Sequence, residues 1–306
     1  MKTQTGSTQL HTAPLPSSRS AWFLLLKTMR PKQWTKNLIV FAGIIFAQKI
    51  FADGYLVMTI YAFITFCILS GSGYIINDII DIEKDRAHPT KKNRPLASGR
   101  LSPPLAIAFV TLTTAFSLGA AFWIKINFGF LAAAYLLTTL SYSFFFKNIV
   151  IIDVLTIAIG FIFRAIAGAV VIAVDISPWL LVCTFLLALF LALTKRRHEL
   201  LLLDKNAGSH RKILAEYEPQ MLDQMISVVT SSTVMAYCLY TFTSGHSNYL
   251  MATIPFVIYG VFRYQYLVYR KDIGGSPETA LLKDPPMLIN IILWVISCSL
   301  ILYFFK

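Results

Sequence analysis

Runs of about 20 predominantly apolar residues repeat from near residue 35 to the C-terminus, with short polar segments between them. A run of this length suits a helix that crosses the hydrocarbon core of a bilayer. Such runs fill nearly the whole chain, since 56% of its 306 residues are hydrophobic and only 14% are charged. The pattern predicts an all-α integral membrane protein with about nine transmembrane helices. The expected spans are residues 37–52, 54–80, 102–124, 128–146, 149–174, 177–195, 225–243, 248–268 and 287–305.

The N-terminal segment differs from the rest of the chain in composition. Residues 1–19 are rich in Thr, Ser, Gln and Pro and lack the apolar core of a signal peptide, so we predict a disordered cytoplasmic tail. Residues 20–36 combine Trp22, Phe23 and Trp34 with basic side chains, as an amphipathic helix at a membrane interface does. Residues 20–306 are therefore expected to form a single transmembrane domain.

The basic residues are distributed unevenly between the two sides of the expected bundle. With nine spans and the N-terminus inside, 23 of the 27 Lys and Arg residues fall in cytoplasmic segments and three fall outside. This asymmetry predicts an inner (plasma) membrane protein whose N-terminus and large polar loops are cytoplasmic. It also explains the net charge of +12 without a nucleic-acid partner, so membrane lipids are the expected surroundings.

The second expected span ends in a cluster of oxygen-bearing side chains, Asn77, Asp78, Asp81 and Asp85. At 100° per residue, a continuous helix places all four within an arc of about 100° on one face. Carboxylate and amide oxygens suit Mg²⁺, which is usually completed by water and substrate phosphates. The alternative is an ordinary solvated helix end, which does not explain why the carboxylates lie on one side.

A basic loop follows the acidic cluster directly, over residues 86–100. Lys91 and Arg94 in this loop can supply the counter-charge that a metal-bound phosphate requires, and Arg can hold phosphate through two parallel hydrogen bonds. A loop that serves only to orient the protein in the membrane would carry similar charge. Charge alone leaves both interpretations open.

The fifth expected span carries charged and small residues in one stripe. Asp153, Gly160, Arg164 and Gly168 lie within about 40° of one another on a helical wheel. Charges within a membrane face the interior of a bundle, and small residues allow helices to approach closely. Asp153 lies near the cytoplasmic end and is a candidate active-site group. Arg164 lies about 16 Å deeper, where it either joins two helices or contacts substrate.

The acidic pattern Asn-Asp-x-x-Asp-x-x-x-Asp of residues 77–85, followed by Arg-Pro-Leu-Ala-Ser-Gly at residues 94–99, resembles the first acidic motif of the UbiA superfamily of intramembrane prenyltransferases. The resemblance implies a helical bundle around a central cavity, with Mg²⁺ bridging a diphosphate substrate to the acidic motif. It also implies that the transmembrane domain is catalytic.

Within that superfamily, the sequence is most similar to the decaprenyl-phosphate phosphoribosyltransferases, through residues 30–37, 147–168, 195–200 and 276–284. This likeness implies transfer of 5-phosphoribose from phosphoribosyl pyrophosphate to a polyprenyl phosphate, with release of pyrophosphate. Members that use prenyl diphosphates usually carry a second acidic DxxxD-like motif. Here Glu199 and Asp204 lie five positions apart in a basic stretch, which favours a second anionic substrate over a second Mg²⁺.

The resemblance assigns the following roles. The expected catalytic residues are Asp78, Asp81, Asp85 and Asp153. The expected Mg²⁺ ligands are Asn77, Asp78, Asp81 and Asp85. The expected ligands of the lipid phosphate are Lys32, Lys36 and Asn37. The expected ligands of the sugar phosphate and pyrophosphate are Lys91, Arg94, Lys147 and Arg197. Further substrate contacts are expected from Tyr142, Arg164, Lys195, Arg196 and Glu199.

Two other functions remain open from the sequence. An aromatic prenyltransferase of the same fold would bind a prenyl diphosphate at the acidic helix, with a quinone or haem precursor as acceptor. A membrane transporter would also explain buried charges such as Asp153 and Arg164, but not the one-sided acidic cluster. The sequence also leaves open whether the chain forms a homo-oligomer.

Overall fold

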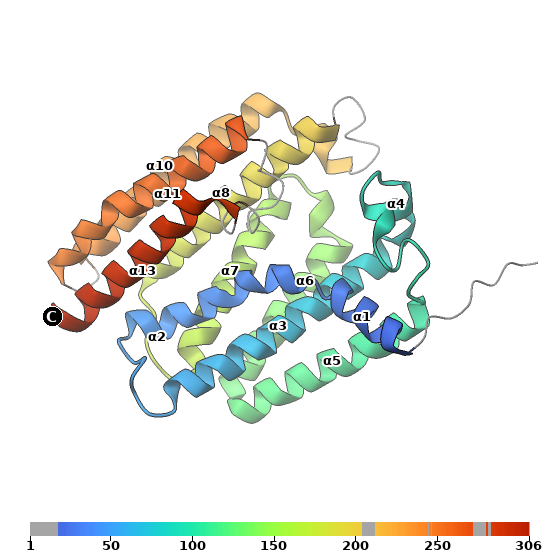
Figure 1. Ribbon diagram of the computed structural model, residues 1–306, viewed down its shortest axis with the longest axis horizontal. Coiled ribbons are helices and arrows are strands. Elements are labelled where there is room, and N and C mark those ends of the chain that lie inside the picture. Colours follow the sequence, from blue (N-terminus) through green and yellow to red (C-terminus); the bar gives the residue numbers. More distant parts are fainter. Residues whose placement is uncertain are drawn as a thin grey trace, which may run out of the picture.

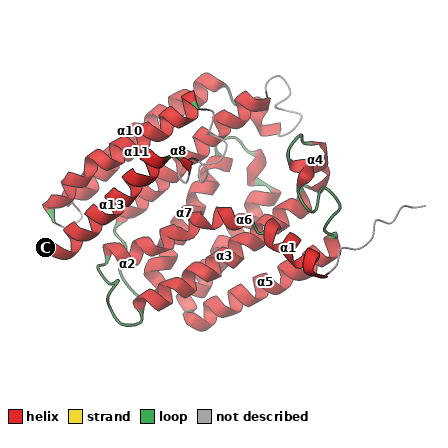
Figure 2. Cartoon of the chain, viewed as in Figure 1, coloured by secondary structure: helices red, strands yellow, loops and turns green. Residues whose placement is uncertain are grey.

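A computed structural model describes residues 18–203, 212–243, 245, 247–271, 280 and 283–305. These residues form helices and connecting loops, and no strand occurs in these ranges (Figure 2). The all-α prediction is therefore confirmed. The predicted N-terminal tail lies almost wholly outside the described residues, as do Asp204 and most of the segment 276–284.

The chain alternates long α-helices with short 3₁₀ helices, labelled η. The first half consists of α1 (Ser18–Thr28), η1 (Pro31–Phe41), α2 (Ala42–Phe46), α3 (Tyr55–Ile80), α4 (Ile82–Ala87), η2 (Lys91–Asn93), α5 (Pro103–Ile124) and α6 (Ile126–Phe144). The second half consists of η3 (Phe146–Asn148), α7 (Ile152–Val171), α8 (Pro178–Leu203), η5 (Lys212–Glu216), α10 (Pro219–Thr243), η6 (Asn248–Thr253), α11 (Ile254–Arg270) and α13 (Pro285–Phe304).

Proline marks the start of five of the long helices. Pro103, Pro178, Pro219 and Pro285 are the first residues of α5, α8, α10 and α13, and Pro255 is the second residue of α11. The first N–H groups of a helix have no partner within it, so proline costs no hydrogen bond there and its fixed φ suits the helix. These prolines help to define where each helix leaves its connecting loop.

The helices form two groups joined by α7. On one side α8, α10, α11 and α13 lie next to one another, and on the other α3 packs against α5 and α6 (Figure 1). Helix α7 contacts both α6 and α8, and so connects the groups. The end of α3, α4, the end of α8 and the start of α10 all lie at one end of the molecule, opposite the C-terminus (Figure 1). The acidic motif of residues 77–85, at the end of α3 and in α4, therefore lies at this end.

Six of the described helices are long and apolar enough to cross a membrane: α3, α5, α7, α8 up to Leu201, α10 and α13. The protein is thus an integral membrane protein, but the expected number of nine spans is not confirmed. The first predicted span is divided between η1 and the five-residue α2, and α11 has only 17 residues. Helix α6 has 19 residues and contains several Thr, Ser and Tyr residues.

The outer faces of the long helices are apolar. On α5, Leu112, Phe116 and Trp123 expose 70%, 67% and 89% of their surface, and α13 exposes Phe304 in the same way. Apolar surface on this scale is unfavourable in water and favourable against lipid chains. The core lies between the helices, in one apolar cluster around α8, α10 and α11 and another around α3, α6 and α7.

Candidate active site

The acidic cluster lies at a break between two helices. Helix α3 ends at Ile80 and α4 begins at Ile82, with Asp81 between them at φ −98° and ψ 12°. The N–H of Asp81 donates to the carbonyl of Asn77 at 3.0 Å, and the carbonyl of Asp81 accepts from Asp85 at 2.8 Å. The structure therefore differs from the continuous helix that the predicted 100° arc assumed. The four residues still lie within one short segment.

Two of the carboxylates share one arginine. Nη1 of Arg94 donates to Asp78 Oδ1 at 3.0 Å and to Asp85 Oδ2 at 2.6 Å. Asp78 Oδ1 also accepts from Nη2 of Arg30 at 2.5 Å, and this guanidinium lies over the ring of Tyr74. Asp78 and Asp85 are buried, whereas the side chains of Arg30 and Arg94 are 28% and 24% exposed. The carboxylates thus lie beneath a layer of partly exposed guanidinium groups.

The third carboxylate has a different partner. Nζ of Lys147, in η3 between α6 and α7, donates to both oxygens of Asp81 at 2.7 and 2.8 Å. The Lys147 side chain is 9% exposed, and the Asp81 side chain is 16% exposed. Lys147 is 66 residues from Asp81 in sequence, so the fold brings together the predicted acidic motif and a predicted phosphate ligand. Among the described residues, no three His, Cys, Asp or Glu side chains form a group that could hold a metal ion.

Asp153 lies in a separate, deeply buried network. Its Oδ2 accepts from Nε of Arg196 at 2.6 Å, and its Oδ1 accepts from the hydroxyl of Tyr217 at 2.9 Å. Arg196 also donates to Glu199 at 2.5 Å and to the hydroxyl of Tyr142 at 3.2 Å. Asp153 and Arg196 expose 0% and 2% of their side chains. Four predicted site residues therefore meet, but Arg196 faces protein groups rather than solvent.

Arg164 and Asn37 form a third polar cluster, inside the bundle. Nε of Arg164 donates to the Asn37 side-chain carbonyl at 2.6 Å, and its two Nη atoms donate to the Gly160 carbonyl and the Tyr135 hydroxyl, each at 2.7 Å. Asn37 is fully buried. The structure thus places Asn37, an expected ligand of the lipid phosphate, inside the bundle, because η1 packs into α7 so closely that a Cβ on Gly168 would meet a backbone carbonyl of η1.

The remaining predicted residues lie closer to the surface. Lys32 is exposed, whereas Lys36 and Lys91 are half-buried. Lys195 lies 3.9 Å from Glu199, on the same helix. Arg197 donates to Asp223 on α10 at 2.5 and 3.3 Å, and its guanidinium stacks 4.1 Å over the ring of Tyr269.

Arg30 and Tyr217 belong to the site but were not among the predicted site residues. Arg30 lies two residues after the end of α1 and directly precedes η1. Its backbone is in the left-handed conformation, at φ 55° and ψ 65°, and its guanidinium reaches Asp78. Arg30 could have been found from the sequence, because it is the first residue of segment 30–37, one of the segments that carry the family resemblance. Tyr217 follows η5 in a segment with no motif, and nothing in the sequence marks it as a partner of Asp153.

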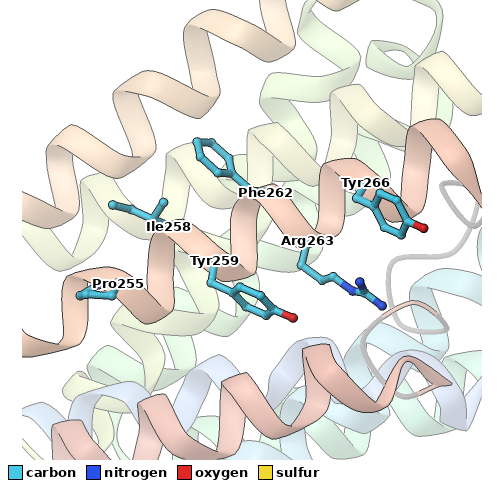
Figure 3. Close-up of a pocket in the computed structure, with 6 residues that line it drawn as sticks. All are labelled: Pro255, Ile258, Tyr259, Phe262, Arg263 and Tyr266. Carbon is cyan, nitrogen blue, oxygen red and sulfur yellow. The ribbon is translucent and has the colours of Figure 1, made fainter.

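A shallow groove of about 520 Å³ runs along α11, lined by Pro255, Ile258, Tyr259, Phe262, Arg263 and Tyr266 (Figure 3). All six residues come from this one helix, and none belongs to the acidic cluster. Arg263 donates to both oxygens of Asp284 at 3.1 and 2.8 Å, which joins α11 to the start of α13. The groove is therefore not the central cavity that the family resemblance implies, and that cavity stays a prediction.

Comparisons with known proteins agree on one family. The family model described as UbiA prenyltransferase family matches residues 37–292. The decaprenyl-phosphate phosphoribosyltransferase of Mycolicibacterium smegmatis is 32% identical, over 92% of this chain and 92% of the relative. The enzyme of the same name from Corynebacterium glutamicum is 32% identical, over 91% of this chain and 86% of the relative.

Solved structures show the same fold. A UbiA homolog from Archaeoglobus fulgidus bound to DMAPP and Mg²⁺ superposes with a TM-score of 0.71 over 92% of this chain and 99% of that chain, at 19% identity. The same homolog bound to GPP and Mg²⁺ gives a TM-score of 0.70 at 19% identity, over 91% of this chain and 99% of that chain. The predicted membership of the superfamily is confirmed: this chain is an integral membrane transferase of the UbiA prenyltransferase family.

Proposed function

We propose that the protein transfers 5-phosphoribose from phosphoribosyl pyrophosphate to the phosphate of a polyprenyl lipid and releases pyrophosphate. The observation that carries this proposal is the identity of 32%, over more than nine-tenths of the chain, to enzymes named decaprenyl-phosphate phosphoribosyltransferase. We place the reaction at the cytoplasmic face of the inner membrane, because the Lys and Arg distribution puts the acidic cluster and its basic loop on that side.

Mg²⁺ fits the acidic cluster because a positively charged group, the guanidinium of Arg94, already lies between two of its carboxylates. Nη1 of Arg94 lies within hydrogen-bond distance of both Asp78 and Asp85, so the two carboxylates already share a cation. Mg²⁺ needs only one or two protein carboxylates when substrate phosphates and water complete its coordination. We infer that Asp78 and Asp85 would hold it, with Asn77 and Asp81 beside them. When bound, Mg²⁺ neutralises charge on the leaving pyrophosphate.

The basic side chains of the cluster would then bind the donor. Arg30, Arg94 and Lys147 each neutralise a carboxylate in the structure. A metal-bound diphosphate presents new anionic oxygens in the same place, and guanidinium groups bind such oxygens through charge-assisted hydrogen bonds. Lys91, in the same basic loop, is close in sequence to Arg94 and is proposed to contact the sugar phosphate. This exchange of partners requires side-chain rotation at Arg30 and Arg94, which are partly exposed, and at Lys147, which is buried.

The acceptor needs little chemical activation. A lipid phosphate is already ionised at pH 7, so no strong general base is required, and positioning carries much of the reduction in the barrier. Lys32 and Lys36 lie in η1, which follows α1 in the chain, and the Trp22 and Phe23 side chains of α1 are 65% and 68% exposed. We propose that the two lysines bind the lipid phosphate while these apolar side chains contact the membrane. Asn37 is assigned to holding η1 on α7.

The buried network around Arg196 argues against a second Mg²⁺ clamp. Glu199 is the nearest counterpart of a second acidic motif, and its carboxylate already accepts from Arg196 and lies near Lys195. The Lys195 and Glu199 side chains are 38% and 27% exposed, so this edge of the network suits a second anionic group better than a second cation. Tyr142 and Arg164 are likewise proposed to support the site through the hydrogen bonds that they form. The aromatic prenyltransferase is therefore the weaker candidate, and membership of a transferase family sets the transporter aside.

The proposal is tested by supplying purified membranes with two alternative substrate pairs in the presence of Mg²⁺. One reaction receives phosphoribosyl pyrophosphate and decaprenyl phosphate, and the other receives a prenyl diphosphate and hydroxybenzoate. Mass spectrometry should identify phosphoribosylated lipid in the first reaction and no prenylated aromatic product in the second. Membranes carrying Asp85→Asn provide the matched control. Product in the second reaction alone would refute the proposed function.

A further inference from the structure

The turn between η3 and α7 has a strained backbone. Ile151 has φ 68° and ψ −45°, and the N–H of Ile152 donates to the carbonyl of Val150 at 2.7 Å. Together these values describe a γ-turn of the rare, strained kind, centred on Ile151. A positive φ is unfavourable for any side chain and more so for a β-branched one. Such a conformation persists only where surrounding contacts hold it, and it occurs most often at functional sites.

One tyrosine hydroxyl holds this turn. The Tyr217 hydroxyl accepts from the N–H of Ile151 at 2.8 Å and donates to Asp153 Oδ1 at 2.9 Å. The Tyr217 side chain is 3% exposed, and burial raises the pKa of Tyr217 to about 12. The hydroxyl therefore keeps its proton at neutral pH and forms both bonds at once. Through it, the strained turn is connected to the buried pair of Asp153 and Arg196.

The turn separates two groups of the site. Lys147, which bonds both oxygens of Asp81, lies four residues before Ile151, and Asp153 lies two residues after it. Asp153 is fixed by Arg196 within the bundle, whereas Lys147 depends on the course of the chain through η3. Relaxing Ile151 to an ordinary φ would change the direction in which η3 leaves α7. The Lys147 ammonium would then move relative to the acidic cluster.

We propose that Tyr217 is a positioning residue that keeps the strained Ile151 turn in place and thereby directs Lys147 into the diphosphate site. The identity of the substrate affected rests on the proposed function, but the coupling between Tyr217 and Ile151 does not. The competing explanation is that Tyr217 serves only to hold Asp153. The two explanations differ in whether relieving the strain at Ile151 makes the hydroxyl unnecessary.

The test combines Tyr217→Phe with Ile151→Gly. Tyr217→Phe should raise the KM for phosphoribosyl pyrophosphate about tenfold, the effect of one weakened charge-assisted phosphate contact, and leave the KM for polyprenyl phosphate unchanged. Adding Ile151→Gly should restore the KM, because glycine adopts positive φ without steric cost. The Ile151 side chain is 41% exposed, so its removal takes little from the core.

Ile149→Gly is the matched control. Ile149 lies in the same turn and is 48% exposed, but its φ of −112° is ordinary, so glycine relieves no strain there. The proposal fails if Ile151→Gly does not restore the KM, or if Ile149→Gly restores it equally. A loss of active protein with both KM values unchanged would also overturn it, since that is what a purely structural role predicts.

Thermal stability separates this inference from the proposed function. The melting temperature of the purified protein in detergent does not depend on which reaction it catalyses. Tyr217→Phe should lower it by about 2–4 °C, and Ile151→Gly should raise it more in the Tyr217→Phe variant than in the wild type. If no variant transfers phosphoribose but this coupling is present, the proposed function fails and the positioning role stands. If Ile151→Gly changes the melting temperature equally in the wild type and in the Tyr217→Phe variant, the role of Tyr217 is refuted.

Discussion

The acidic cluster at the break between α3 and α4 and the buried network between α7 and α8 both pair carboxylates with basic groups, yet they differ in exposure. Arg30 and Arg94, which cover the acidic cluster, have side chains that are 28% and 24% exposed. Arg196 and Asp153, at the centre of the buried network, have side chains that are 2% and 0% exposed. Partly exposed groups can exchange partners at little cost, whereas a buried charge that loses its partner is strongly destabilising.

This difference indicates that the acidic cluster and the buried network have different roles, although both contain carboxylates and basic groups. The basic groups over the acidic cluster can leave their carboxylates when a cation and a diphosphate arrive, because water and substrate replace the lost contacts. The groups of the buried network cannot, because no such replacement reaches them. Sequence alone treats Arg94, Arg196 and Arg197 alike, as candidate substrate ligands. Substitutions of these arginines and of their partners should therefore differ in whether stability or turnover is lost.

The largest expected effect is on stability, from Arg196→Met. The substitution leaves Asp153 and Glu199 without their shared guanidinium inside the protein, and breaking a buried pair in this way costs about 3–5 kcal/mol. We expect a large fall in the melting temperature of the detergent-solubilised protein and little recovery of folded material.

Arg197→Met is the neighbouring control for that experiment. Arg197 pairs with Asp223, whose side chain is 38% exposed, so the loss of stability should be within about 1 kcal/mol. Equal losses of stability in the two variants would remove the distinction between buried and exchangeable groups.

The second prediction concerns turnover at the acidic cluster. Asp85→Asn removes one negative oxygen donor from the segment that is proposed to hold Mg²⁺, and it should lower Mg²⁺-dependent turnover by about a hundredfold or more. The melting temperature should change little, because Asp85 shares Arg94 with Asp78. Activity is measured across a Mg²⁺ titration, with Asp81→Asn tested in parallel. Wild-type activity in both variants at every Mg²⁺ concentration would disprove the metal assignment.

The third prediction separates donor from acceptor. Arg94→Ala should weaken the apparent affinity for phosphoribosyl pyrophosphate, and Lys36→Ala should weaken that for polyprenyl phosphate. Each lost charge-assisted phosphate contact should cost about ten- to a hundredfold in affinity. Steady-state kinetics with each substrate varied in turn measures both effects. A large effect of Lys36→Ala that is confined to the sugar donor would contradict the proposed assignment.

The smallest expected effect is a dependence of the protein's stability on pH that arises from Asp284, at the start of α13. Asp284 accepts from Arg263 and from the N–H of Met287, and these hydrogen bonds hold the pKa of the Asp284 carboxyl below its usual range. A lowered pKa adds stability above the unfolded pKa of about 3.9, and this stability is lost as the pH falls through the folded value. Between pH 5 and pH 3, the melting temperature should therefore fall slightly more in the wild type than in Asp284→Asn. An identical pH dependence in the two proteins would argue against the ion pair.

Much of the fold was predictable because it depends on residues that are near in sequence. Apolar runs of membrane-spanning length predicted the helices, and six described helices meet that expectation. The total of nine is not confirmed. Residues 37–52 fold as a 3₁₀ helix followed by the short α2, and α6 and α11 are not among the six helices that are long and apolar enough to span a membrane. A hydrophobic sequence indicates that a segment is excluded from water. It does not distinguish one continuous spanning helix from short helices such as η1 and α2, which pack against α7.

The candidate site was predicted as a set of residues but not as a set of contacts. The acidic motif was recognisable because its members lie within nine positions, whereas the bond from Lys147 to Asp81 spans 66 residues. The same limit applies to Asn37, whose partner Arg164 is 127 residues away and draws it into the interior. Tyr217 was missed because a single tyrosine outside any motif carries no signal until its hydroxyl is seen between Ile151 and Asp153.

By itself, the sequence determined that this protein is a helical membrane transferase of the UbiA family with an acidic motif at a helix end, because composition, periodicity and short motifs are local properties of the chain. Only the tertiary structure decided which basic groups reach that motif and which are buried in separate networks. Arg94 and Arg196 are both basic residues in polar breaks of the sequence, and they differ only in what packs around them. Solvent exposure and the distance to a partner arise from packing between distant segments, which no local pattern encodes.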